Sequence, residues 1–246
     1  MIDTHAHLGA DAADVLERAR AAGVTRVVAV ATTVAGARDA LALAEKYEGV
    51  FVCLGVHPHE AGSPGDLTEL GELLEHPKAV AVGETGLDYF RTGPEGKAAQ
   101  ERSFRAHIEI AKRHGKALVI HDRDAHADVL RVLKEEGAPE RTVFHCYSGD
   151  AVMAEICAQA GYYMSFAGNM TFKNAQPLRD ALAVAPLELV LVETDAPFLT
   201  PAPYRGRPNA PYLIPVTVRA MAAVRGIDED TLATALSANT ARAFGY

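Results

Sequence analysis

Eight short apolar runs recur along the chain, separated by segments of different character. They consist almost entirely of Val, Ala, Leu and Ile, as in TRVVAVA at 25–31 and LELVLV at 187–192. Strands that are apolar at nearly every position are buried on both faces, which is typical of a parallel sheet covered by helices. We therefore expect strands at 1–4, 25–31, 50–56, 78–83, 116–120, 141–144, 162–166 and 187–192.

The intervening segments carry apolar residues at helical spacing, so strands and helices alternate. We expect helices at 11–22, 34–47, 67–75, 95–114, 124–136, 150–160, 175–184, 212–225 and 229–244. Eight strands alternating with helices in 246 residues predict a (β/α)8 TIM barrel, formed by residues 1–246 as a single domain. An open doubly wound sheet is the alternative fold, but no G-x-G-x-x-G follows the first strand.

Composition narrows the class of protein. The formal net charge of −8 argues against non-specific nucleic-acid binding through a broad basic surface, although a local cationic site is compatible with it. Three cysteines without C-x-x-C spacing indicate neither a disulfide framework nor a cysteine zinc site. No apolar window reaches the roughly 18 residues of a membrane helix, and the start lacks a signal-peptide pattern. We expect a soluble, cytoplasmic protein.

In a barrel of this kind the active site lies at the carboxyl ends of the strands. His5 and His7 lie two residues apart at the first strand, so an extended backbone directs both imidazoles to the same face. An isolated H-x-H is more often a pair of surface or core histidines. Here, however, metal-binding residue types follow nearly every predicted strand: His5, His7, His57, His59, Glu84, His121, His145, Glu193 and Asp195.

The strand-end set contains more ligands than one tetrahedral ion with an open position needs. It suits two divalent ions about 3.5–4 Å apart that share a carboxylate. We expect Zn, Mn or Mg, with Fe and Ni also compatible with a mixed imidazole and carboxylate shell. The assignment is Glu84 as the bridge, His5, His7 and Asp195 on one ion, and His121 and His145 on the other. Glu84 and Asp195 are the expected catalytic carboxylates, Asp195 as the base toward the attacking water.

Cationic side chains near the same strand ends indicate a phosphate-containing substrate. Arg123 follows His121, and Arg205 and Arg207 lie in the proline-rich segment 196–211. The alternative for the arginines is that each pairs with a carboxylate such as that of Asp122 or Asp124, or packs the loop. His57 and His59 are further candidate substrate contacts, or they form a structural turn around Pro58. Phe166, Asn169 and Phe172 either stack on a base or pack a lid. Asp88 and Tyr89 either orient Glu84 or the substrate, or close the loop.

An ordered set of motifs resembles the TatD family of metal-dependent deoxyribonucleases. The segments are DTHAHL (3–8), GVHPHE (55–60), GETGLDY (83–89), IHDRDA (120–125), HCYSG (145–149), ETDAPFL (193–199), PYRGRPNAP (203–211) and NTARAF (239–244). The resemblance implies a (β/α)8 barrel related to the amidohydrolases. It also implies metal ligands at His5, His7, Glu84, His121, His145 and Asp195, and 3′→5′ exonuclease activity on DNA, with some members acting at abasic sites or on RNA.

These observations together predict a divalent-metal-dependent phosphodiesterase that shortens DNA from 3′ ends, preferably single-stranded, through in-line attack by a metal-bound hydroxide. RNA is a second expected partner. One alternative is an amidohydrolase-like enzyme acting on an amide, ester or lactone, against which the arginine-bearing loop argues. The other is a non-catalytic metal-binding or nucleic-acid-binding scaffold, which would have no need for the full ligand set.

Overall fold

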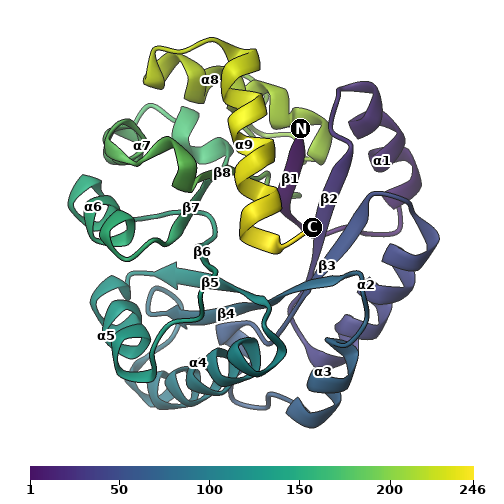
Figure 1. The fold of residues 1–246 in the computed structure, drawn as a ribbon, viewed down its shortest axis with the longest axis vertical. Coiled ribbons are helices and arrows are strands. Elements are labelled where there is room, and N and C mark those ends of the chain that lie inside the picture. Colours follow the sequence, from purple (N-terminus) through teal and green to yellow (C-terminus); the bar gives the residue numbers. More distant parts are fainter. The chain divides into compact units, whose positions relative to one another are not determined.

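The computed structural model describes all of residues 1–246, and the strands form one sheet in the order β1-β2-β3-β4-β5-β6-β7-β8. Strands and helices alternate along the chain (Figure 1), which confirms the predicted (β/α)8 TIM barrel. The strands are β1 (Ile2–Ala6), β2 (Arg26–Ala31), β3 (Val50–Leu54), β4 (Ala79–Asp88), β5 (Ala117–Arg123), β6 (Thr142–Phe144), β7 (Tyr163–Phe166) and β8 (Val190–Val192). The helices are α1 (Ala12–Ala21), α2 (Val34–Lys46), α3 (Leu67–Leu73), α4 (Pro94–His114), α5 (His126–Glu136), α6 (Ala151–Gln159), α7 (Gln176–Val184), α8 (Ile214–Arg225) and α9 (Glu229–Phe244).

By their internal contacts, residues divide into two compact units. The first unit comprises residues 1–28 and 145–242, and the second comprises residues 29–144 and 243–246. No helix in either unit combines the length and the apolar character needed to cross a membrane. Each unit carries part of the predicted site.

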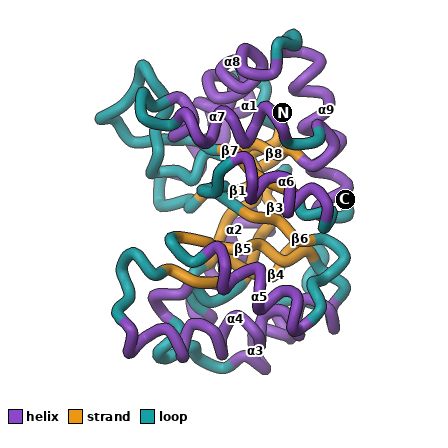
Figure 2. Tube along the Cα trace, turned by 90° about the vertical axis from the view of Figure 1, so that its left-hand side faces the viewer, coloured by secondary structure: helices purple, strands orange, loops and turns teal.

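In the second unit, α4 and α5 pack on the β4–β5 pair, as Figures 1 and 2 both show. Helix α4 begins with Pro94 at its first position and ends at Gly115, whose φ of +59° is the left-handed conformation common after a helix. Phe104, Ile108 and Ala111 form its buried stripe at helical spacing. This packing holds β4 and β5, the strands that carry Glu84 and His121.

Strand β4 is longer than predicted, because it continues past Gly83 to Asp88. Its register against β5 shifts between Val82 and Thr85, so Glu84 lies at an irregularity inside the strand rather than at its end. Gly83 and Gly86 both have positive φ, and a Cβ on either would lie 2.4 Å or less from a carbonyl oxygen of β5. The glycines that suggest a strand end in the sequence are therefore required inside the strand by its close approach to β5.

In the first unit, β7 pairs with β8, and α7 packs against both α6 and α8 (Figure 1). Strand β8 is shorter than predicted, since 187–189 form a 3-10 turn after Pro186 before the strand begins at Val190. Beyond the strand, the backbone N–H of Asp195 donates to the carbonyl of His5 at 2.9 Å, and that of His7 donates to the carbonyl of Ala196 at 2.8 Å. These bonds tie the segment after β8 to the end of β1.

Candidate metal centre

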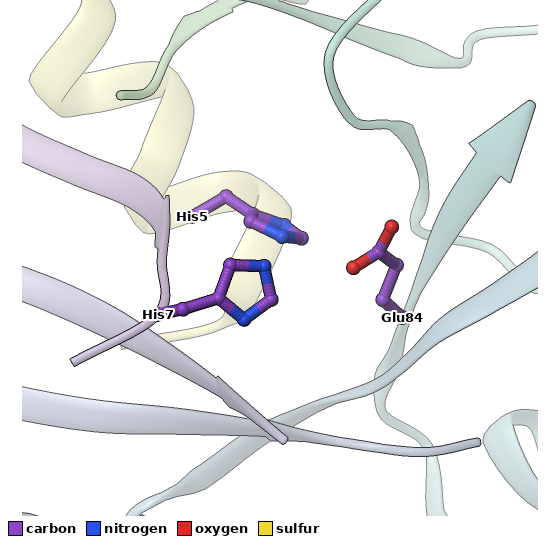
Figure 3. A group of neighbouring side chains, drawn as sticks. All are labelled: His5, His7 and Glu84. Atoms are coloured by element: carbon purple, nitrogen blue, oxygen red, sulfur yellow. The ribbon is translucent and has the colours of Figure 1, made fainter. Parts of the chain in front are cut away.

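The first group of candidate ligands belongs to the first unit and starts at the end of β1. His5 is the penultimate residue of the strand and is fully buried, whereas His7 follows the strand and is partly exposed. Their ring centroids are 5.3 Å apart with the rings edge to face, and Figure 3 shows both imidazoles projecting from this segment. The predicted convergence of the two histidines is therefore present within the unit.

His145, after β6, and Asp195, after β8, join this pair. The His145 ring stacks on that of His5, with centroids 3.9 Å apart and planes inclined by 13°. Asp195 Oδ1 lies 3.9 Å from His5 Nε2 and 3.7 Å from His7 Nε2. One ligand atom from each of His5, His145 and Asp195 lies within 4.8 Å of the others, so three elements of one unit supply a possible cation site.

Two buried carboxylates support these ligands: Glu193, which the sequence singled out without a role, and Asp3, which it did not single out. Oε1 of Glu193 accepts from His145 Nδ1 at 3.1 Å and from the backbone N–H of Cys146 at 2.8 Å. A histidine whose Nδ1–H is held by a carboxylate presents its Nε2 lone pair to a metal. Asp3 accepts from the backbone N–H and the hydroxyl of Thr194, and burial raises its pKa to about 7 against the opposing effect of these bonds. Asp3 thereby fixes the residue that precedes Asp195.

The second group of candidate ligands belongs to the second unit. Glu84 Oε1 lies 2.7 Å from His121 Nδ1 and 3.5 Å from His57 Nε2, and the Glu84 side chain is almost fully buried. One ligand atom from each of these three residues lies within 4.8 Å of the others. Figure 3 shows the Glu84 carboxylate directed away from its strand. His57, which we expected to contact substrate, is thus also placed with two of the predicted ligands.

The Asp88 carboxylate contacts His121 of this group and the neighbouring His59. Its Oδ2 lies 3.0 Å from His121 Nε2 and 3.1 Å from His59 Nε2, and its Oδ1 accepts from the backbone N–H of Arg91 at 2.9 Å. Burial would raise the pKa of Asp88, but the hydrogen bonds from His121 and Arg91 and the charge on the neighbouring histidines hold it well below its usual range. Asp88 therefore contacts His121 and His59, whereas the expectation from the sequence was that it orients Glu84 or the substrate, or closes the loop.

A period of two along β4 is the sequence signal that places Asp88 on the same face as Glu84. Glu84, Gly86 and Asp88 occupy alternate positions of one extended segment and so share a face.

Burial lowers the pKa of His59, and the neighbouring His57 lowers it further against the opposing effect of Asp88. His59 therefore favours its neutral form. Its contact with Asp88 is then a hydrogen bond from a neutral ring and not an ion pair with a fixed positive charge.

His107 of α4 holds the backbone that leads into His57. Its Nε2 accepts from the backbone N–H of Val56 at 3.1 Å, and its Nδ1 lies 2.7 Å from the carbonyl oxygen of Ser103, to which it donates. Full burial lowers the pKa of His107 to about 4, so the ring is neutral at physiological pH. Nothing in the local sequence pattern shows which backbone group this ring contacts.

The candidate substrate-binding arginines share one arrangement. The Arg123 guanidinium lies 3.9 Å from the centroid of the Phe90 ring, and that of Arg205 lies 4.0 Å from the centroid of Phe172. Asp122, one of the carboxylates considered as a partner for Arg123, lies 2.8 Å from His126 Nδ1 instead. Phe166, by contrast, is buried in the core and is not available for stacking on a base.

The chemistry of both groups fits divalent metal binding. Each combines imidazole nitrogens with a carboxylate, a donor set typical of Zn, Mn or Fe sites. Three protein ligands leave positions for water or substrate on an ion, as in catalytic rather than structural sites. The supporting carboxylates of Glu193 and Asp88 give the histidines the outer hydrogen bonds usual for metal-bound imidazoles.

Comparison with known proteins assigns the chain to a family. The family model described as TatD related DNase matches residues 2–245. The chain belongs to the TatD family. It is 44% identical over 258 residues to a protein of Mycobacterium tuberculosis H37Rv named as an uncharacterized metal-dependent hydrolase TatD, covering 100% of this chain and 98% of the relative. The metal-dependent hydrolase YcfH of Escherichia coli K12, also uncharacterized, is 39% identical, covering 99% and 95% of the two chains.

A solved TatD structure agrees with the fold. The crystal structure of YjjV, a TatD homologue from Escherichia coli K12, superimposes with a TM-score of 0.93 at 33% identity, covering 100% of this chain and 98% of that one. The family match and the named relatives identify this TatD-family chain as a metal-dependent hydrolase with a TIM-barrel fold. The histidine and carboxylate groups described above are its possible metal-binding residues.

Proposed function

We propose that the protein is a divalent-metal-dependent deoxyribonuclease that removes nucleotides from the 3′ ends of DNA. The observation that carries the proposal is the pair of imidazole and carboxylate groups in a chain that belongs to a family described as TatD related DNase. Arginines held on exposed or half-buried aromatic rings add the means to bind a phosphate. An amide or lactone substrate would give these guanidinium groups no equivalent anion.

The proposed metal ligands are those that the motifs indicated. They are His5, His7, Glu84, His121, His145 and Asp195, with Glu84 as the carboxylate shared by two ions. Neighbouring ligand atoms support the ligand set, although His145 groups with His5 and Asp195, whereas we expected it on the ion of His121. The second group adds His57 as a further candidate. Glu193 and Asp88 support the ligand set further, because each contacts one nitrogen of a ligand histidine, Glu193 that of His145 and Asp88 that of His121.

Two divalent ions, when bound, would supply Lewis-acid activation of water and neutralise charge on the phosphodiester. The protein's own contribution begins with Asp195, whose carboxylate accepts the proton of the attacking water. The hydrogen bond from its backbone N–H to the His5 carbonyl fixes the position of this residue. Arg123 and Arg205 would bind the phosphate oxygens through their N–H edges. His59, whose Nε2 lies 3.1 Å from Asp88 Oδ2, would accept a hydrogen bond from a substrate hydroxyl through Nδ1.

The charge of the protein bears on which nucleic acid it takes. A net charge of −8 supplies no general attraction for a long duplex, so affinity must come from the ions and a few arginines. We propose single-stranded 3′ ends of DNA as the preferred substrate, with RNA as a second substrate class. Intracellular action in the cytoplasm is part of the same proposal.

The test is hydrolysis of a 5′-labelled single-stranded DNA oligonucleotide by the chelated protein, before and after addition of Mg, Mn or Zn. A metal-restored ladder that shortens from the 3′ end supports the proposal and ranks the ions. Internal cuts in intact duplex would contradict the exonuclease part. If protein shown by elemental analysis to hold two ions cleaves no DNA or RNA with any metal, the nuclease proposal fails and a panel of chromogenic esters and lactones is the next substrate set.

A further inference from the structure

Phe90 places an aromatic ring at the surface immediately after β4. The residue is 60% exposed, although its side chain is large and apolar. The neighbouring Tyr89 donates its backbone N–H to the carbonyl of Arg123 at 2.9 Å, and Asp88 is the register partner of Arg123 in the sheet. The exposed ring is therefore attached to a rigid strand pair rather than to a long loop.

The Arg123 guanidinium covers one face of this ring, with its central carbon 3.9 Å from the ring centroid. A guanidinium that stacks on an aromatic face keeps its N–H groups in a plane that points sideways, where they remain available to an anion. The 60% exposure of Phe90 persists although Arg123 covers one face, so the remaining ring surface faces solvent. The pair thus offers a cationic edge and an open aromatic surface side by side.

This pair lies next to one of the candidate ligand groups within the same unit. Arg123 and His121 are two residues apart in β5 and share a face of the strand. Phe90 follows by two residues the Asp88 carboxylate that contacts His121. A phosphate bound near His121 would therefore have both the arginine edge and the aromatic ring as neighbours.

We propose that Phe90 and Arg123 form a nucleotide subsite in which Arg123 binds the phosphate and the open face of Phe90 stacks on a nucleobase. The inference rests on the proposed nuclease function and adds the part of the substrate that is recognised. Stacking on an aromatic face tolerates every base, because each base has a π-face. The subsite therefore selects for the presence of a base and not for its identity. It also distinguishes nucleotides from simple phosphodiesters.

The experiment compares two substrates with the same leaving group, thymidine 5′-(p-nitrophenyl phosphate) and methyl p-nitrophenyl phosphate. Only the first carries a base. The variants are Phe90→Leu, which keeps apolar bulk but removes the π-face, and Phe90→Trp, which enlarges it. Ile156→Ala, a loss of exposed apolar surface on α6, is the matched control. Thermal unfolding of each variant establishes that it is folded.

We expect Phe90→Leu to raise KM for the thymidine ester about tenfold, within the range for loss of one stacked base. Its kinetics on the methyl ester should stay within about twofold of wild type, and Phe90→Trp should keep or lower KM for the thymidine ester. An equal loss on both substrates would mean that Phe90 only positions Arg123. An unchanged KM on both would exclude any contact with the base. Either result overturns the proposal.

A binding measurement separates this inference from the nuclease proposal. If wild-type protein hydrolyses neither ester and also cleaves no DNA or RNA, the proposed function fails, and calorimetric binding of thymidine 5′-monophosphate and 2-deoxyribose 5-phosphate still tests the subsite. We expect wild type to bind the nucleotide about tenfold more tightly than the sugar phosphate, and Phe90→Leu to remove that preference. Equal affinity of wild type for the two ligands would overturn the subsite.

Discussion

The Nδ1 atom of His145 lies 3.1 Å from Oε1 of Glu193, a carboxylate that has no exposed surface. The same oxygen accepts the backbone N–H of Cys146 at 2.8 Å, so Glu193 fixes both the ring and the backbone next to it. A buried carboxylate in this role sets the tautomer of the imidazole and raises its basicity as a ligand. Glu193 is therefore a positioning residue for the first candidate ligand group.

Replacing this carboxylate with an amide should weaken metal binding. We expect Glu193→Gln to lower the affinity for Zn or Mn by about 10–100-fold, because a neutral partner makes His145 a poorer ligand. Competition with a fluorescent chelator measures the affinity without reference to activity. Glu188→Gln, in the exposed turn before β8, is the control and should bind as wild type does. Unchanged metal affinity in Glu193→Gln would show that Glu193 does not support metal binding.

Loss of either proposed catalytic carboxylate should remove activity while the fold persists. We expect Asp195→Asn to lower kcat on the oligonucleotide about 10²–10⁴-fold, the usual contribution of a general base. Glu84→Ala should abolish activity at the same metal concentration, because it deletes the proposed shared ligand. Asp180→Asn, exposed on α7, is the control. Full activity in both site variants, together with wild-type unfolding temperatures, would contradict the two-ion assignment.

Arg123 should act through its planar fork as well as through its charge. We expect Arg123→Lys to raise KM for single-stranded DNA about tenfold, since a lysine keeps the charge but neither stacks flat on Phe90 nor binds phosphate through two N–H groups. Arg219→Lys, on the exposed side of α8, is the matched control and should be neutral. If Arg123→Lys binds and cleaves DNA as wild type does, the residue contributes only charge.

The apolar strand pattern was enough to predict the barrel, because fully buried strands leave a continuous signal that helices interrupt at regular intervals. It also placed His5 near the end of β1, whereas Glu84 lies inside β4 and not at the expected strand end. The boundaries of β4 were wrong because Gly83 and Gly86 have the residue type of a strand break, whereas the close approach of β5 requires glycine at both positions. Local sequence does not report which backbone lies opposite a glycine.

The supporting residues were harder to predict than the ligands. Glu193 and Asp88 are buried, and the role of each depends on which histidine nitrogen it contacts in the folded protein. His145 is 48 residues away from Glu193 along the chain, so no local spacing connects them. The surroundings of the arginines were equally hard to predict. The sequence indicated phosphate binding, but it did not indicate that the guanidinium groups lie on the rings of Phe90 and Phe172.

His107 should make the stability of the protein depend on pH. Its pKa in the folded protein is lowered by burial to about 4, below the value of about 6.5 expected for an unfolded chain. A lowered pKa means that the unfolded state binds the proton more readily, so the stability is fully present above pH 6.5. It is lost progressively as the pH falls toward 4. Between pH 7.5 and 4.5 this residue alone should remove about 2–3 kcal/mol from the free energy of unfolding.

The variant His107→Gln isolates this contribution from the other groups that titrate in the same range. A glutamine does not titrate but can still accept from the backbone N–H of Val56, so the variant should unfold with a smaller dependence on pH than wild type. Urea unfolding at pH 7.5 and 4.5 gives the two free energies for each protein. His76→Gln, whose imidazole lies partly exposed beside Glu45, should retain the wild-type pH dependence. Equal pH dependence in wild type and His107→Gln would show that His107 is not buried as a neutral ring.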